Sequence, residues 1–176
     1  MKRIVLLIAV FTIGLLGQAP SQVVRESVEG IGNLALIETT VACAGAITPE
    51  SVSDIKGMGF ESIINLRLAS ESGANVDAEE AAAQAAGIRY FHIPFNGGSP
   101  EAGVVDQFLE AIERPGSEPA FIHCAGGNRA AAMWFAKRAI VDGWDVDRAM
   151  IEATELGFRS VPLKAFMVEY VEGHSR

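Results

Sequence analysis

The chain has 176 residues, of which 14 are basic and 22 acidic, and its formal net charge at pH 7 is −8. This length suits one domain with a single sizeable core, and the acidic balance argues against general nucleic-acid binding or docking on anionic lipid. Three histidines and two cysteines, Cys43 and Cys124, make a poor case for a metal centre.

The first 21 residues are expected to be a secretory signal peptide. Lys2 and Arg3 precede a mostly apolar stretch of thirteen residues, Ile4 to Leu16, which small and polar residues follow. We therefore expect residues 22–176 to form one exported domain, secreted or periplasmic, with no stable membrane association after cleavage. A membrane span needs about 20 apolar residues, so a retained N-terminal membrane anchor is the lesser alternative.

Strands and helices are predicted to alternate along the rest of the chain. Residues 22–33 mix polar and apolar types and are expected to form a loosely packed leader before a strand at 34–40. The segment Thr48-Pro49-Glu50 predicts a helix start, and that helix should end at Gly57 or Gly59. The other expected elements are strands at 60–66, 88–94 and 120–123, and helices at 76–86, about 101–112, 130–142, 146–156 and 161–171.

This alternation predicts an α/β fold: a single domain with a central, mostly parallel sheet of four to five strands and helices on both faces. Ligands of such sheets bind at the carboxyl ends of the strands. Arg67, the loop at residues 94–98 and Cys124 each follow the end of a predicted strand. We therefore expect three loops to converge on one edge of the sheet.

The eight residues HCAGGNRA, His123 to Ala130, carry the chemistry that we expect. Two glycines let a loop turn its N–H groups inward, and a helix N-terminus adds unpaired N–H groups and partial positive charge, so the segment predicts an anion-binding loop. The same dipoles would stabilise a thiolate on Cys124, and Arg129 could fork onto two phosphate oxygens. A buried cysteine beside a simple turn is the alternative interpretation.

The segment resembles the phosphate-binding loop of cysteine-dependent protein tyrosine and dual-specificity phosphatases, whose pattern is His-Cys, two residues, Gly, two residues, Arg, then Ser or Thr. Here four residues, not five, separate Cys124 from Arg129, which is similar to the bacterial branch described as the beta-lactamase hydrolase-like phosphatase domain. Over residues 42–158 the chain also resembles that branch in CAGAITPESVSDIKGMGFESIINLR, GIRYFHIPF and EATELGF. The resemblance implies a protein tyrosine phosphatase-like fold and a phosphorylated substrate, either a phosphoprotein or a small phosphate ester, with no cofactor and no metal.

The resemblance also implies roles for individual residues. Cys124 would attack phosphorus and carry a cysteinyl-phosphate, while Arg129 and backbone N–H groups would bind the phosphoryl oxygens. The phosphate-binding loop further includes His123, Ala125, Gly126, Gly127 and Asn128. Two accessory candidates are Arg67, as a second phosphate contact, and Glu155, as a residue that orients the loop; a simple salt bridge is the alternative for each.

Two positions depart from the family pattern. The Ser or Thr after the arginine, which assists departure of the thiolate, is Ala130 here. The loop PFNGGSPE has Asn96 where dual-specificity phosphatases carry the aspartic acid that protonates the leaving oxygen. Glu101 and Asp106 lie nearby but suit the first turns of a helix, so the general acid stays unassigned. These departures favour one alternative, an inactive phosphate- or anion-binding module.

A rhodanese-like sulfurtransferase that uses a Cys124 persulfide is a second alternative, because rhodanese loops can carry Cys, two residues, Gly, one residue, Arg. Rhodaneses, however, have an Asp-Val-Arg strand end and a Gly-His-Ile segment, and neither occurs here. In an oxidising compartment Cys43 and Cys124 could form a structural disulfide or a reversible redox bridge. We favour free thiols, because a bridge would leave the anion-binding loop without its nucleophile.

Overall fold

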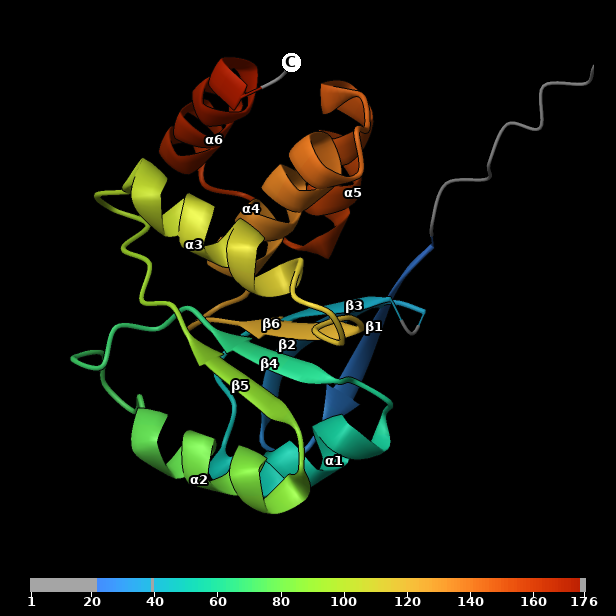
Figure 1. The fold of residues 1–176 in the computed structure, drawn as a ribbon, viewed down its shortest axis with the longest axis vertical. Coiled ribbons are helices and arrows are strands. Elements are labelled where there is room, and N and C mark those ends of the chain that lie inside the picture. Colours follow the sequence, from blue (N-terminus) through green and yellow to red (C-terminus); the bar gives the residue numbers. More distant parts are fainter. Residues whose placement is uncertain (1–21, 39, 175–176) are drawn as a thin grey trace, which may run out of the picture.

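The computed structural model describes residues 22–38 and 40–174, so the expected signal peptide, residues 1–21, lies outside the described residues. Within the described ranges one six-stranded sheet has the order β1-β2-β3-β6-β4-β5. Helices cover both of its faces (Figure 1). The fold is therefore α/β, as the alternation of elements predicts. No helix in these ranges is long and apolar enough to cross a membrane.

The sheet is mixed, with a parallel part of four strands. The strands are β1 (Val23–Val28), β2 (Ile31–Ile37), β3 (Val41–Ala44), β4 (Ser62–Asn65), β5 (Arg89–His92) and β6 (Ala120–His123). β1, β2 and β3 pair antiparallel, whereas β3, β6, β4 and β5 pair parallel. The parallel part brings the carboxyl ends of its strands to one edge of the sheet, where ligands of such folds bind.

The N-terminal part of the sheet differs from the sequence-based expectation. Residues 22–33 are not a loosely packed leader: β1 and β2 form a hairpin in which Val28 lies opposite Ile31 and Val23 opposite Ile37. β2 ends at Ile37, and β3 follows before the helix start, so the sheet has six strands instead of four to five. β1 is an edge strand with mostly exposed side chains, and its sequence therefore lacks the apolar run that marks a buried strand.

The helices divide between the two faces of the sheet. They are η1 (Pro49–Ser51), α1 (Val52–Gly57), α2 (Val76–Ala86), α3 (Ala102–Ile112), α4 (Asn128–Ala136), the π-helical η2 (Lys137–Val141), α5 (Val146–Leu156) and α6 (Val161–His174). Figure 1 shows α1 and α2 on one face and α3 to α6 on the other. α4 begins at Asn128, two residues before the predicted start at residue 130, so Arg129 belongs to its first turn.

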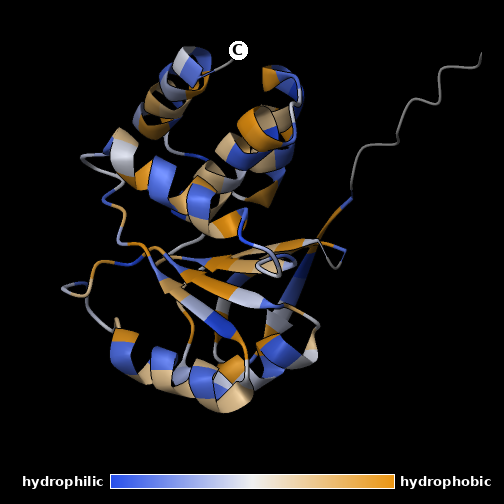
Figure 2. Cartoon of the chain, viewed as in Figure 1, coloured by the Kyte–Doolittle hydropathy of each residue, from blue (hydrophilic) through white to orange (hydrophobic). Residues whose placement is uncertain are grey.

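Two apolar layers enclose the sheet, and apolar residues dominate its central strands (Figure 2). The layer beneath α3 to α6 includes Trp134 and Phe135, and the layer above α1 and α2 includes Phe60 and Phe121. Side chains alternate along β6. Cys124 therefore belongs to the α4 layer, whereas His123 turns to the opposite face and contacts Glu79 of α2.

Candidate active site

The loop between β6 and α4 encloses the sulfur of Cys124. Cys124 follows β6 directly and is 1% exposed, and its Sγ accepts a hydrogen bond from the Gly127 N–H at 3.2 Å. Gly127 is the N-cap of α4 and has a φ of +90°, a conformation that favours glycine. Because the first N–H groups of a helix have no acceptor within it, the start of α4 can bind an anion beside this sulfur.

A second loop, at the end of β3, supports the phosphate-binding loop through the backbone. The Cys124 N–H donates to the Ala44 carbonyl at 3.2 Å, and the Ala46 N–H donates to the Ala125 carbonyl at 3.1 Å. Gly45 permits this approach, because a Cβ there would lie 3.0 Å from Gly32 O and 3.1 Å from Ala125 O. The loop conformation is therefore fixed from outside as well as by its own glycines.

Arg129 is held by Glu71, which comes from the loop after β4. Its Nη1 donates to Glu71 Oε1 at 2.6 Å and its Nη2 to Glu71 Oε2 at 2.9 Å. Burial opposes the charge of Arg129, but Glu71 and the Cys124 sulfur outweigh it and raise the pKa of the guanidinium. The hydrogen bond from Arg129 is the largest of the effects that lower the pKa of Glu71 to about 2, so this carboxyl is ionised at neutral pH.

Sequence reasoning did not find Glu71. It lies in the segment LASESGAN, which lacks the periodicity of a helix or strand, and its partner Arg129 is 58 residues away. The one available signal was its position four residues after Arg67, since an acid can pair with a base at that spacing. That spacing marks a salt bridge on a helix, and this segment is a loop.

Arg67 binds the same loop and does not line the cavity as the expected second phosphate contact would. It is 3% exposed, and its guanidinium donates to the carbonyls of Ser72 at 2.6 Å and Gly73 at 2.8 Å. Its Nε also lies 3.4 Å from Glu71 Oε2. The side-chain donors of Arg67 therefore bind the loop that carries Glu71.

The structure does not bring Glu155 to the phosphate-binding loop. Glu155 is exposed on α5, where its backbone carbonyl accepts a hydrogen bond from Arg25 at 2.7 Å and its side chain lines a separate hollow. Asn128, in place of Glu155, connects the phosphate-binding loop to a neighbouring segment. The Oδ1 of Asn128 accepts from the N–H groups of Arg159 at 2.7 Å and Ser160 at 2.9 Å, which joins the first turn of α4 to the chain between α5 and α6.

His123 lies in a buried polar network on the far side of the sheet from the Cys124 sulfur. Its Nε2 is 3.3 Å from Glu79 Oε2 without hydrogen-bond geometry. Asn65 at 2.8 Å and Tyr90 at 2.9 Å donate to the same Glu79 oxygen. Burial, the largest effect, lowers the pKa of His123 below 6.5, so its ring is neutral at pH 7. His123 therefore anchors the end of β6 and does not face the substrate side.

A cavity of about 510 Å³ opens over Cys124. Its lining comes from the loops after β4, β5 and β6, from the first turn of α4 and from the residue before α6: Leu68, Glu71, Asn96, Gly97, Gly98, Cys124, Ala125, Gly126, Asn128, Arg129 and Ser160. Three loops thus converge on one edge, as expected. Gly97 lets its loop pack on Arg129, because a Cβ there would lie 3.3 Å from the Arg129 Cγ.

The cavity offers no obvious general acid. Glu71 is the one carboxyl among its lining residues, and its low pKa keeps it ionised. Asn96 does line the cavity, and its Oδ1 accepts from the Gly98 N–H at 3.0 Å. Glu101 and Asp106 are not part of the lining, and Asp106 accepts a hydrogen bond from Tyr170 of α6.

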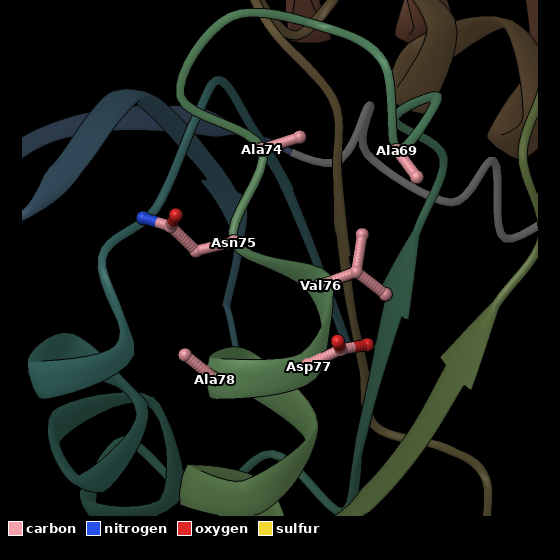
Figure 3. A pocket seen from close by; sticks show the side chains of 6 residues that line it. All are labelled: Ala69, Ala74, Asn75, Val76, Asp77 and Ala78. Carbon is pink, nitrogen blue, oxygen red and sulfur yellow. The ribbon is translucent and has the colours of Figure 1, made fainter.

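A smaller hollow and a second thiol lie outside the lining of this cavity. A hollow of about 320 Å³ at the start of α2 is lined by Ala69, Ala74, Asn75, Val76, Asp77 and Ala78 (Figure 3). One acid and no base line it, so it does not suit an anion. Cys43 lies in β3 opposite Ile122, and both thiols are free. In residues 22–38 and 40–174 no group of three or more His, Cys, Asp or Glu could hold a metal ion.

A family model matches most of the chain. The model described as the phosphatase-like domain of beta-lactamase hydrolase-like protein covers residues 33–141. Beta-lactamase hydrolase-like proteins of two Xylella fastidiosa strains, Temecula1 and 9a5c, are each 32% identical over 109 residues. That match covers 61% of this chain and 25% of each relative, so the chain spans about a quarter of their length.

Solved structures share the fold at lower identity. A DUF442 protein from Shewanella putrefaciens CN-32 is 22% identical with a TM-score of 0.70, over 84% of this chain and 97% of that one. The core catalytic domain of the PP-IP phosphatase SIW14 from S. cerevisiae is 18% identical with a TM-score of 0.64, over 82% of this chain and 88% of that one. P. aeruginosa TpbA in complex with pTyr is 22% identical with a TM-score of 0.62, over 90% of this chain and 93% of that one.

The two kinds of comparison agree with the geometry around Cys124. The family model spans β3 to β6, most of β2, the phosphate-binding loop and α4, and the structural neighbours include phosphatases with the same fold. The chain therefore belongs to the phosphatase-like domain family of beta-lactamase hydrolase-like proteins.

Proposed function

We propose that the chain hydrolyses a phosphate monoester or phosphoanhydride through a cysteinyl-phosphate on Cys124. The family and the fold support a phosphatase of this class. The observation that carries the proposal is one cavity that contains the Cys124 sulfur, the N-terminus of α4 and Arg129. A nucleophile, oxyanion donors and a guanidinium are the groups that phosphoryl transfer to a thiolate requires.

In the first step the Cys124 thiolate attacks phosphorus in line with the leaving oxygen. The S–P bond forms while the P–O bond to the leaving group breaks, and the bonding electron pair stays on the leaving oxygen. Arg129 and the N–H groups at the start of α4 stabilise the charge on the other phosphoryl oxygens. The leaving oxygen takes its proton from water, because the cavity lining supplies no protonated carboxyl.

In the second step water attacks the cysteinyl-phosphate. A new P–O bond forms, the S–P bond breaks with its electrons returning to sulfur, and the proton of the attacking water passes to solvent. Ala130 offers no hydroxyl to assist departure of the thiolate, so this step is expected to be slow. The cycle ends with inorganic phosphate and a free Cys124 thiolate.

The proposed partner is a phosphoprotein or a small phosphate ester. Among the structural neighbours, SIW14 is described as a PP-IP phosphatase and TpbA is seen with pTyr. Arg129 is the one cationic side chain in the cavity lining here, and Glu71 balances its charge. This charge favours a single phosphoryl group on a good leaving group, such as an aryl phosphate or an anhydride, over a densely phosphorylated ligand.

A phosphate-binding module without turnover is the second candidate. Ala130 and the lack of an acid in the cavity lining favour it. It would bind inorganic phosphate at Cys124 and hydrolyse nothing. The same assay separates the two functions.

The test is hydrolysis of p-nitrophenyl phosphate under reducing, metal-free conditions. We expect the wild type to hydrolyse this ester and both Cys124→Ser and Arg129→Ala to lose the activity, because one removes the nucleophile and the other the guanidinium. Arg114→Ala removes an exposed arginine at the end of α3 and serves as the control. A folded wild type without activity would contradict the proposal, and the same samples would then be tested for phosphate binding and for sulfur transfer from thiosulfate to cyanide.

A further inference from the structure

We propose that Asn96 is a site of deamidation, and that its conversion to aspartate gives the Cys124 cavity a general acid. The catalytic part of this inference rests on the proposed function. Asn96 is followed by Gly97, and it is the only one of the five asparagines in the chain that precedes a glycine. Asparagine deamidates most readily before glycine, because no side chain then hinders attack of the next backbone nitrogen on the amide carbon.

The reaction is an intramolecular acyl transfer that needs only water. The Gly97 nitrogen gives its proton to water and bonds to Asn96 Cγ, and ammonia leaves with a proton from water, so a cyclic succinimide remains. Water then adds at Cγ and breaks the bond to the Gly97 nitrogen, which regains its proton. The product has an intact backbone and an aspartate at position 96. Addition of water at the other carbonyl carbon gives isoaspartate instead.

The structure leaves the reacting groups of Asn96 accessible. The side chain is exposed, and its Oδ1 accepts a hydrogen bond from the Gly98 N–H at 3.0 Å. This donor stabilises the negative charge that develops on Oδ1 during the attack. Within residues 22–38 and 40–174, neither the Gly97 N–H nor the Asn96 Nδ2 donates a hydrogen bond. The attacking nitrogen and the leaving group are therefore both free of partners that would hold them back.

The fold also accommodates the product. Aspartate has the shape of asparagine and keeps the oxygen that accepts from the Gly98 N–H, and the lost NH₂ group had no acceptor. The loop from Asn96 is closed by a second bond, from the Ser99 N–H to the Asn96 carbonyl at 3.1 Å. Deamidation to aspartate therefore exchanges an amide for a carboxyl without breaking a contact of this turn.

The new carboxyl would stand at the wall of the catalytic cavity, because Asn96 lines it together with Cys124 and Glu71. The negative charges of the Cys124 thiolate and Glu71 favour the protonated form of a further carboxyl. In that form it can give its proton to the leaving oxygen, and as a carboxylate it can take a proton from the attacking water in the second step. Deamidation would thus extend the activity to poorer leaving groups.

The experiment ages the purified full chain in mildly alkaline buffer at physiological temperature and samples it at intervals. Peptide mass spectrometry follows the mass gain at Asn96, and isoaspartyl methyltransferase labelling separates isoaspartate from aspartate. Asn75 is the internal control, because it is exposed but precedes Val76. We expect Asn96 to convert, in part to aspartate, while Asn75 remains an amide.

The same samples are assayed with phenyl phosphate and p-nitrophenyl phosphate. The ratio of kcat/KM for phenyl phosphate to that for p-nitrophenyl phosphate should rise in proportion to the fraction of aspartate. Extrapolated to full conversion, the rise should be about tenfold or more, and Asn96→Asp should show it without ageing. Asn96→Gln keeps an amide whose longer chain cyclises far more slowly, so its ratio should stay constant.

Each part of the proposal can fail on its own measurement. Deamidation of Asn96 no faster than that of Asn75 would overturn it, as would isoaspartate as the sole product, aspartate with an unchanged ratio, or an equal rise in Asn96→Gln. A protein that hydrolyses neither ester, fresh or aged, overturns the proposed function and the catalytic role together, while the mass spectra still decide whether Asn96 deamidates.

Discussion

Cys124 and Cys43 have different surroundings in the fold. Both are buried, and they lie on the neighbouring strands β6 and β3. Burial, the largest effect, raises the pKa of Cys43 well above its usual value, and the nearby Cys124 and Glu152 add to the rise. The Cys124 sulfur has the Gly127 N–H at 3.2 Å and Arg129 nearby. Of the two cysteines, only Cys124 lines the cavity.

Asn96 provides a test of the missing general acid. It lines the cavity, and the resemblance to dual-specificity phosphatases predicts an acid in this loop, so Asn96→Asp would place a carboxyl beside the leaving oxygen. The wild type should hydrolyse p-nitrophenyl phosphate much faster than phenyl phosphate, because p-nitrophenolate leaves readily without a proton and phenolate does not. Asn96→Asp should narrow this difference about tenfold or more, measured as the ratio of the two kcat/KM values.

Asn75→Asp is the matched control for this prediction. Asn75 is exposed at the start of α2, its side chain makes no capping hydrogen bond, and it does not line the Cys124 cavity. The substitution Asn75→Asp introduces the same negative charge away from the site and should leave the ratio of the two kcat/KM values unchanged. Equal ratios for wild type and Asn96→Asp would show that this loop does not reach the leaving group.

The sequence predicts the central residues of the site better than their supports. Cys124 and Arg129 stand at a characteristic spacing between a strand and a helix, so their types and order suffice. The pairing of Arg129 with Glu71 joins loops that are 58 residues apart, and no local pattern marks such a contact. Arg67 stands at a strand end as expected, but the direction of its side chain depends on the conformation of the loop that follows.

At the scale of elements, α4 depends on a connection to the chain before α6. Gly127 and Asn128 form the turn into α4, and the side chain of Asn128 binds two backbone N–H groups between α5 and α6. Ser160, one of these two residues, also lines the cavity. The amide side chain of Asn128 therefore connects the phosphate-binding loop to the segment that contains Ser160 on the other side of the cavity.

Two substitutions at Asn128 should separate stability from binding. Asn128→Ala leaves two backbone N–H groups without their acceptor and should lower the free energy of unfolding by about 1–3 kcal/mol. Asn128→Asp keeps an oxygen acceptor and should retain most of that stability, but its negative charge should weaken binding of inorganic phosphate about tenfold. Urea denaturation measures the first quantity and protection of Cys124 from iodoacetamide the second.

Asn75→Ala controls for removal of an exposed amide at a helix start. If Asn128→Ala were as stable as Asn75→Ala, the connection to residues 159 and 160 would contribute nothing to folding. If Asn128→Asp bound phosphate as tightly as wild type, the start of α4 would not be the anion site.

The elements that sequence predicts well are those with strong boundaries. α2 is followed by its C-cap Gly87 with a φ of +65°, and α5 is preceded by its N-cap Asp145, whose Oδ1 accepts from two backbone N–H groups. The β1–β2 hairpin was missed because β1 is an exposed edge strand. Its stability comes from pairing with β2 in the sheet, and the composition of residues 22–33 does not reveal a pairing partner.

At the scale of the molecule, the parallel part of the sheet creates the site. β6 lies between β3 and β4, so the loop that carries Cys124 has the Gly45 support on one side and the Glu71 loop on the other. The alternation of elements predicts parallel strands and their common edge. It does not predict the strand order or the antiparallel pairs of β1 to β3, which arise from contacts distant in sequence. The signal peptide stays a prediction.

The most direct measurement of the central claim is detection of phosphate on Cys124 during turnover. Wild type mixed with p-nitrophenyl phosphate and quenched rapidly should show a burst of nitrophenol, because Ala130 leaves the second step slow, and peptide mass spectrometry should find a phosphoryl group on the peptide that carries Cys124. Cys124→Ser should show neither. Steady hydrolysis by the wild type without a burst and without phosphate on Cys124 would contradict the account.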